Sequence, residues 1–173
     1  RVTLANGESA TVRFGADGIF TALRYQDRAG NISEYDSLGR LIRVTDSTHQ
    51  TLTNYLYKAN GEVEVTTSLL TTGAVLNTVS LLMGADGRLG TADDRLLAVA
   101  GFQNGHSFAE VFDAQGRMTE FFGYQETARR DALGRFVRAD GTIAMTEQEA
   151  AKVVTYQRLS YDWSASGRVT IST

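Results

Sequence analysis

Three aspartates in one glycine-rich loop are the residues best suited to bind an ion. Asp86, Asp93 and Asp94 lie within the stretch from Gly84 to Asp94. Ca²⁺ prefers carboxylate and carbonyl oxygens, and glycines let a backbone wrap around an ion. The stretch lacks the alternating acids and the final glutamate of an EF-hand, and three carboxylates are few for a tight calcium site. Ca²⁺ is thus the one cofactor that the sequence suggests, and a double turn capped by the same aspartates is the favoured alternative.

Catalytic chemistry has little support in the sequence. Only His49 and His106 are available as imidazole bases, each stands in a polar stretch, and neither follows a nucleophile motif. The chain has no cysteine, which excludes thiol catalysis and thiolate zinc sites. Most aspartates fit turn positions, so a carboxylate pair for glycoside chemistry is also disfavoured. We therefore predict no catalytic residues and no enzyme activity.

One heptad, Tyr35-Asp36-Ser37-Leu38-Gly39-Arg40-Leu41, organises the chain. It returns at 112–118 and 130–136, and a looser copy with two extra loop residues spans 161–169. Aspartate at the first turn position and glycine at the fourth favour a type I turn followed by a left-handed residue, which closes a hairpin. The predicted turn residues are Asp36, Gly39, Arg40, Asp113, Gly116, Arg117, Asp131, Gly134, Arg135, Asp162, Gly167 and Arg168.

The arginines of these copies have two interpretations. A ladder of guanidinium groups beside Tyr25, Tyr35, Phe112 and Tyr161 would bind a sugar or a carboxylate by stacking and paired hydrogen bonds. Alternatively, each arginine closes its own turn against its own aspartate. The second interpretation is favoured because the spacing explains it without a ligand.

The pattern aromatic-Asp-x-x-Gly-Arg-apolar resembles the YD repeat of rearrangement-hotspot (Rhs) proteins, of the C components of insecticidal toxin complexes, and of teneurins. The resemblance covers roughly 19–45, 108–122, 128–139 and 156–171. It implies long antiparallel sheets that form a shell around a toxin or around the protein's own C-terminal segment. It also implies a bacterial secreted or cell-surface location. The copies are less evenly spaced than in that family, and a chain this short cannot enclose a protein cargo.

Length and composition indicate one domain over residues 1–173. The net charge is -3, and no Lys/Arg run interleaves with aromatics, so nucleic acid is not an expected partner. No apolar stretch is long enough to span a membrane. Because the chain opens on Arg1, we expect it to be a piece of a longer protein whose remainder is its main partner.

The predicted fold is an all-β antiparallel meander of hairpins, twisted and partly rolled. Turns made by Gly, Asn and Asp, with no proline among 173 residues, are typical of hairpin-dense sheets. In 41–44 and 119–122 apolar residues fall on both strand faces, so we expect the second face to be covered as well. One short helix is predicted near 146–154, where Thr146 and Glu149 have capping-box spacing.

These observations favour a non-catalytic scaffold or shell module. The alternative is an adhesin-like module that binds calcium, carbohydrate or a protein partner.

Overall fold

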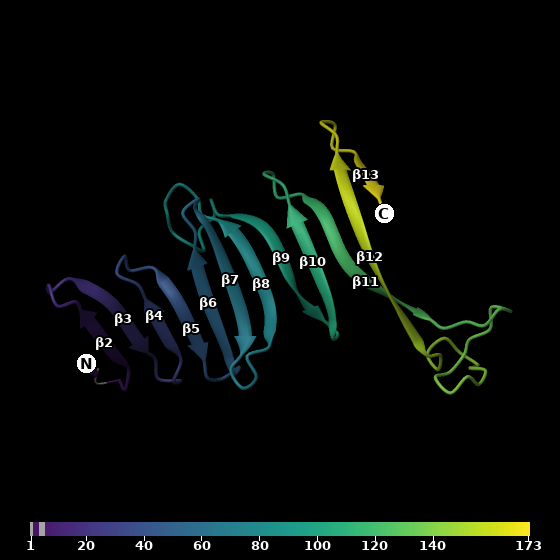
Figure 1. Cartoon of the computed structure of the whole chain (residues 1–173), viewed down its shortest axis with the longest axis horizontal. Coiled ribbons are helices and arrows are strands. Elements are labelled where there is room, and N and C mark those ends of the chain that lie inside the picture. Colours follow the sequence, from purple (N-terminus) through teal and green to yellow (C-terminus); the bar gives the residue numbers. More distant parts are fainter. Residues whose placement is uncertain (1, 4–5) are drawn as a thin grey trace.

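The structure is a computed structural model, and it describes residues 2–3 and 6–173. It is one sheet of 13 antiparallel strands in strict sequence order, so each strand pairs only with its neighbours along the chain (Figure 1). The strands are β1 (Val2–Thr3), β2 (Ser9–Phe14), β3 (Phe20–Gln26), β4 (Ile32–Tyr35), β5 (Leu41–Asp46), β6 (Thr51–Tyr57), β7 (Glu62–Leu69), β8 (Val75–Leu82), β9 (Arg95–Gln103), β10 (His106–Phe112), β11 (Met118–Ala128), β12 (Lys152–Trp163) and β13 (Val169–Ser172). The predicted all-β meander is confirmed.

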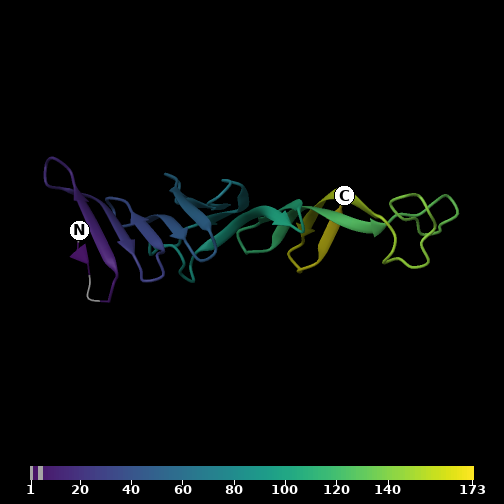
Figure 2. The same ribbon diagram turned by 90° about the horizontal axis from the view of Figure 1, so that it is seen from below.

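The sheet is open and forms a single layer. Strands β1 and β13 stand at opposite ends of the strand order. Viewed from below, the layer twists along its long axis, and residues 129–151 extend beyond it (Figure 2). The sheet does not close into a barrel.

The meander divides the connections between two edges. The turns after β2, β4, β6, β8, β10 and β12 lie along one edge, which we call the turn edge, and the others lie along the opposite edge (Figure 1). The copies of the heptad that join strands, after β4, β10 and β12, all lie at the turn edge.

The two faces of the layer differ in chemistry. Paired residues share a face, and successive residues alternate between faces. One continuous row of pairs, on what we call the polar face, runs Thr11, Arg24, Glu34, Arg43, Asn54, Thr66, Thr78, Ala100, Ala109, Phe122 and Arg158. A row on the other face, the apolar face, runs Tyr55, Val65, Val79, Val99, Glu110, Phe121 and Leu159.

A bulge breaks the alternation at the start of β5 and of β11, whereas Phe121 and Phe122, after the bulge of β11, do lie on opposite faces. The register of β4 and β5 shifts between Glu34 and Tyr35, and that of β10 and β11 shifts between Val111 and Phe112. Each shift adds one residue to the outgoing strand directly after the turn, so strict alternation breaks there. The apolar residues expected on both faces are present at 119–122, and Leu56 is a further apolar residue on the polar face; that the second face is covered stays a prediction.

A single layer leaves almost no interior. Within the described residues, Val63 is the one strand hydrophobe that is fully buried. The accessible surface is 11329 Å², whereas a compact monomer of this mass exposes about 8,300 Å². About 3,000 Å² of surface that a globular fold would hide is therefore open.

The helix predicted near 146–154 is wrong. Residues 145–150 form bends and turns, and Lys152 already begins β12. A helix of about two turns has little stability of its own, and the β-branched run after Lys152 gains more from pairing with β11. The side chain of Glu149 pairs with Arg138 instead of capping a helix.

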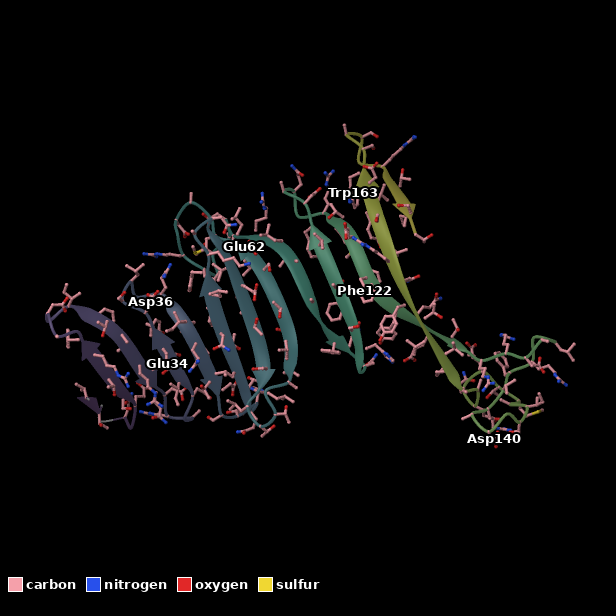
Figure 3. All side chains as sticks on the ribbon, in the orientation of Figure 1. Glu34, Asp36, Glu62, Phe122, Asp140 and Trp163 are labelled. Carbon is pink, nitrogen blue, oxygen red and sulfur yellow. The ribbon has the colours of Figure 1, made fainter. Side chains whose placement is uncertain are left out.

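Residues 129–151 form a small lobe between β11 and β12. The lobe buries Val137, Ala144 and Ala150, and two isolated bridges, Arg130 to Phe136 and Val137 to Ile143, hold its turns. It lies beyond the edge opposite the turn edge, as the position of Asp140 shows (Figure 3). In the described residues there is no helix that could cross a membrane.

Val63 tests how much the thin interior contributes. We expect Val63→Ala to lower the free energy of unfolding by about 2 kcal/mol, because it removes two buried methyl groups and leaves a cavity. Leu56→Ala, on the adjacent strand and 57% exposed, is the matched control and should cost about 0.5 kcal/mol or less. Urea denaturation measures both, and equal losses would contradict this account of the sheet.

Candidate functional site: the turn edge and the loop at 84–94

Eight turns in the described residues share one backbone geometry. The amide of the first residue donates to the carbonyl of the fifth, and the amide of the fourth, a glycine, donates to the carbonyl of the first. All eight glycines have φ between 74° and 87°, which a side chain would strain. The first residues of these turns are Gly15, Asp27, Asp36, Lys58, Asp113, Asp131, Arg138 and Ser164.

In the turn that starts at Asp36, this geometry is reinforced by the aspartate side chain. Its Oδ1 accepts from the amides of Leu38 and Arg40, both at 2.9 Å, and its Oδ2 accepts from Arg40 Nε at 2.8 Å and Nη2 at 2.7 Å. Burial acts to raise the pKa of Asp36, but the hydrogen bonds from Arg40 and Leu38 outweigh it and lower that pKa. The predicted pairing of Asp36 with Arg40, and of Tyr35 with Leu41, is confirmed.

The same arrangement recurs in two other predicted copies. Arg117 donates to Asp113, and Arg135 donates to Asp131, each through Nε at 2.8 Å and Nη2 at 2.7 Å. The hydrogen bond from Arg135 is the main cause that lowers the pKa of Asp131. The copy at 131–135 joins no two strands of the sheet, however, because it lies inside the lobe at 129–151.

The turn arginines also contact the following hairpin. Arg40 Cζ lies 4.5 Å from the centre of the Tyr57 ring, and Arg117 Cζ lies 5.4 Å from the Trp163 ring. Tyr57 and Trp163 occupy the same position, the last residue of a strand before its turn. A guanidinium over an aromatic face is attracted by the ring quadrupole.

A hydrogen bond accompanies each of these stacks. The Tyr57 hydroxyl donates to the Leu41 carbonyl at 3.0 Å, and the Trp163 indole donates to the Met118 carbonyl at 2.6 Å. Leu41 and Met118 each directly follow a turn arginine. We call the combination of stack and hydrogen bond the hairpin lock.

The turn arginines therefore have both of the contacts considered from the sequence: a pair with their own aspartate and a stack on an aromatic ring. Arg40 and Arg117 close their own turns, as favoured, but their aromatic partners are Tyr57 and Trp163 of the next hairpin and not the residues expected beside them. Sequence reasoning missed these two aromatics. The missed signal is an aromatic residue placed four residues before a glycine, without Asp or Arg between them, as in Tyr57 and Gly61.

The final copy of the heptad is different from the one predicted. Asp162 lies within β12 opposite Thr170, so it is not a turn residue. Ser164 takes the aspartate position: its amide donates to the Arg168 carbonyl at 2.8 Å, and its hydroxyl accepts from the Arg168 amide at 3.1 Å. The copy thus spans Trp163–Val169 with no extra residues, and the predicted roles of Gly167 and Arg168 as turn positions are kept.

One copy at the turn edge reverses the charges. Lys58 stands at the aspartate position and Glu62 at the arginine position, and Lys58 Nζ lies 2.8 Å from Glu62 Oε1. Figure 3 places Asp36, Glu62 and Trp163 along this same edge. An ion pair of either polarity suits the fifth-to-first contact, because the backbone geometry sets the spacing.

The loop at 84–94 uses its aspartates as caps. Asp94 accepts from the amides of Gly84, Gly90 and Thr91 at 3.0, 2.5 and 3.2 Å. Asp93 accepts from the Thr91 hydroxyl at 2.7 Å, and that bond is the main cause that lowers the pKa of Asp93.

The third aspartate of the loop is also engaged. Asp86 Oδ1 accepts from the Arg88 amide at 2.8 Å and from the Thr91 hydroxyl at 3.4 Å. Within residues 2–3 and 6–173, no group of three or more acids or histidines is arranged to hold a metal ion. The capped double turn describes this geometry better than a calcium shell, and calcium binding stays a prediction.

The loop also covers part of the apolar face. Arg88 and Leu89 line an open hollow of about 560 Å³ together with Tyr35, Tyr55 and Tyr57. Burial raises the pKa of Tyr55 and of Tyr57. The loop therefore shelters the first hairpin lock.

A second hollow lies on the polar face near the N-terminal end of the sheet. Its volume is about 340 Å³, and Arg13, Arg24, Arg43 and Glu34 line it. Arg43 lies 3.6 Å from Glu34 and donates to Asn54 at 3.2 Å. The guanidinium groups gathered here come from strands and not from the turns that the sequence singled out.

The two histidines lie in different surroundings. His49 Nδ1 is 2.7 Å from Asp46 in the exposed turn after β5. His106 lies in β10 against Tyr124, with ring centres 4.4 Å apart. The hydrogen-bond partner of His49 is Asp46, and that of His106 is the Tyr156 hydroxyl, at 3.4 Å.

Comparisons with known proteins add no identity: no family model matches the chain, and no curated protein matches it.

Trp163 is the only tryptophan in the chain, which makes the hairpin lock measurable. We expect Arg117→Ala to shift the Trp163 emission to longer wavelength and to lower the urea midpoint, because the ring loses its cation and becomes more exposed to water. Arg135→Ala removes the same turn pair within the lobe and is the matched control. It should leave the emission maximum unchanged, and an equal shift in both variants would contradict the lock.

The loop at 84–94 gives a metal test. Backbone amides and Thr91 already occupy the aspartate oxygens. We therefore expect the same melting temperature in excess calcium as in the presence of a chelator. Asp94→Asn should lower the melting temperature equally in both solutions, since it weakens three amide caps. Calcium at a hundred times its Kd would add about 2.7 kcal/mol to the stability. A clear rise that Asp94→Asn abolishes would therefore establish a metal site.

Proposed function

We propose that this chain is a non-catalytic structural module, a scaffold or shell segment of a secreted or surface-exposed bacterial protein of the YD-repeat kind. The observation that carries the proposal is the hairpin lock, which joins β5 to β6 and β11 to β12 through equivalent contacts. A contact that recurs between successive hairpins allows a sheet to grow by repetition. A single-layer sheet of this kind is suited to form an extended structural surface, which we call a wall.

The exposed surface supports a structural role within a larger assembly. About 3,000 Å² more surface is open than in a compact monomer of this mass, and the row from Tyr55 to Leu159 is largely apolar. An apolar sheet face in water is unfavourable by roughly 25 cal/mol per Å². The remainder of a parent polypeptide is the partner that we propose for this face.

The resemblance supplies the proposed location. The copies at 35–41, 112–118 and 130–136 follow the YD pattern. The non-catalytic part of the proposal is supported by the sequence around His49 and His106, neither of which stands in a nucleophile motif.

Limited trypsin digestion tests the proposal, because arginines mark both the turns and the long loops. A structural wall must hold its sheet without any ligand, so the first cuts should fall after Arg88 in the loop and after Arg129, Arg130, Arg135 or Arg138 in the lobe. Cleavage after Arg40 and Arg117, which the lock protects, should come only with global unfolding. Mass spectrometry of timed samples identifies the order.

Two outcomes would contradict the proposal. Early cuts after Arg40 and Arg117 would mean that the hairpins open independently, and no wall is formed. A digestion pattern that tightens only when a small molecule is added would mean that the fold serves a ligand site and not a scaffold.

A further inference from the structure

A cluster of rings lies between β10, β11 and β12, with Phe122, Tyr124 and Tyr156 on the polar face and the ring of His106, the first residue of β10, beside them. Phe122 and Tyr156 are stacked, with centres 5.6 Å apart and planes 6° from parallel. His106 lies 4.4 Å from Tyr124 and 6.3 Å from Tyr156, measured between ring centres. We call these four residues the aromatic platform, and Figure 3 shows Phe122 on it, between the turn edge and the lobe.

The aromatic platform differs in residue type from the rest of its row on the polar face. The row that contains Phe122 otherwise carries Thr, Arg, Glu, Asn and Ala side chains. Phe122 is 41% exposed and Tyr156 is 48% exposed, so water meets much of both rings. Ala109 lies directly opposite Phe122, and Ala100 opposite Ala109, so the neighbouring strands leave one flank of the rings uncrowded.

Polar groups bound the platform at both ends. At one end Arg158 Nη2 donates to Glu120 at 2.6 Å. At the other, His106 Nε2 lies 3.5 Å from Glu126, His106 Nδ1 lies 3.4 Å from the Tyr156 hydroxyl, and Asn104 donates to the Tyr124 hydroxyl at 3.2 Å. Donors and acceptors of both kinds therefore surround the exposed rings.

The exposed rings and the polar groups around them favour one class of ligand over others. A nucleic acid strand would stack on the rings but would bring phosphates against Glu120 and Glu126, in a chain whose net charge is -3. A purely apolar segment would desolvate the rim charges without replacing their hydrogen bonds. A pyranose ring has a C–H face that packs on an aromatic ring and an edge of hydroxyls that both donate and accept.

We propose that the aromatic platform binds a neutral oligosaccharide, with sugar rings on Phe122 and Tyr156 and hydroxyls on the polar rim. From Glu120 to Glu126 the strand covers about 20 Å, a length that suits several linked sugars better than one. This binding role goes beyond the structural role proposed above and does not depend on it.

The test begins with the whole chain on an array of neutral and acidic glycans, followed by titration calorimetry with the neutral glycan that binds best. Tyr156→Ala should weaken binding at least about tenfold, because a stacking ring and its apolar area are lost. Tyr156→Phe keeps the ring and loses only the hydroxyl, so it should stay within about threefold of the parent. Phe14→Ala, which removes a ring that is 63% exposed at the far end of the sheet, is the matched control and should change affinity by less than about twofold.

Three results would overturn the inference. One is the absence of any neutral glycan that binds, and another is an affinity that Tyr156→Ala does not change while Trp163 emission shows an intact fold. The third is binding to acidic glycans or nucleic acid alone, lost in high salt, which would assign the surface to a different ligand class. None of these results would alter the trypsin pattern, so failure here is distinguishable from failure of the structural proposal.

Discussion

A sheet of one layer has no interior, and this constraint shapes the whole molecule. Packing against a second layer normally supplies most of the apolar burial of a β domain. Here each strand touches only its two neighbours, and Val63 is the one strand hydrophobe of the described residues that is fully buried. Stability must therefore come from ladder hydrogen bonds and from side-chain contacts between adjacent strands. The hairpin lock concentrates several such contacts at one edge.

The hairpin lock explains how one heptad determines both a turn and a contact with the next hairpin. Aspartate and glycine fix the turn, arginine spans from its own turn to the next hairpin, and the aromatic of that hairpin returns a hydrogen bond. Each component is weak alone, since surface ion pairs and cation–π contacts contribute about 1 kcal/mol or less. Together they link one hairpin to the next at two places in the sheet, between β5 and β6 and between β11 and β12.

The sequence was sufficient for the local part of this structure. Alternating strands and Asx-Gly turns predicted the hairpins, and hairpins between neighbours give a meander without any long-range information. The pairing of Asp36 with Arg40 followed from spacing alone. The Arg40 contact with Tyr57 did not, because it requires knowing which strand lies beside which and where each bulge shifts the register.

The errors also have physical causes. Thr146 and Glu149 have the spacing of a helix start, but Arg138, brought near by the turns of the lobe, takes the Glu149 carboxylate. The residue type favours Asp162 as the turn residue, whereas in the structure Ser164 accepts from the Arg168 amide in the place of an aspartate. The aromatic platform was invisible because Phe122, Tyr156 and His106 come from three strands and their assembly depends on register.

The order of the strands has a mechanical consequence. The long axis of the layer runs across the strands, so tension between its two ends acts along the ladder hydrogen bonds and not along the strands (Figure 1). Because the two ends of the chain belong to the end strands, a pull on the termini acts first on the ladder bonds that hold those strands. Bonds loaded in this geometry break one after another, whereas in a sheet loaded in shear they would have to break together.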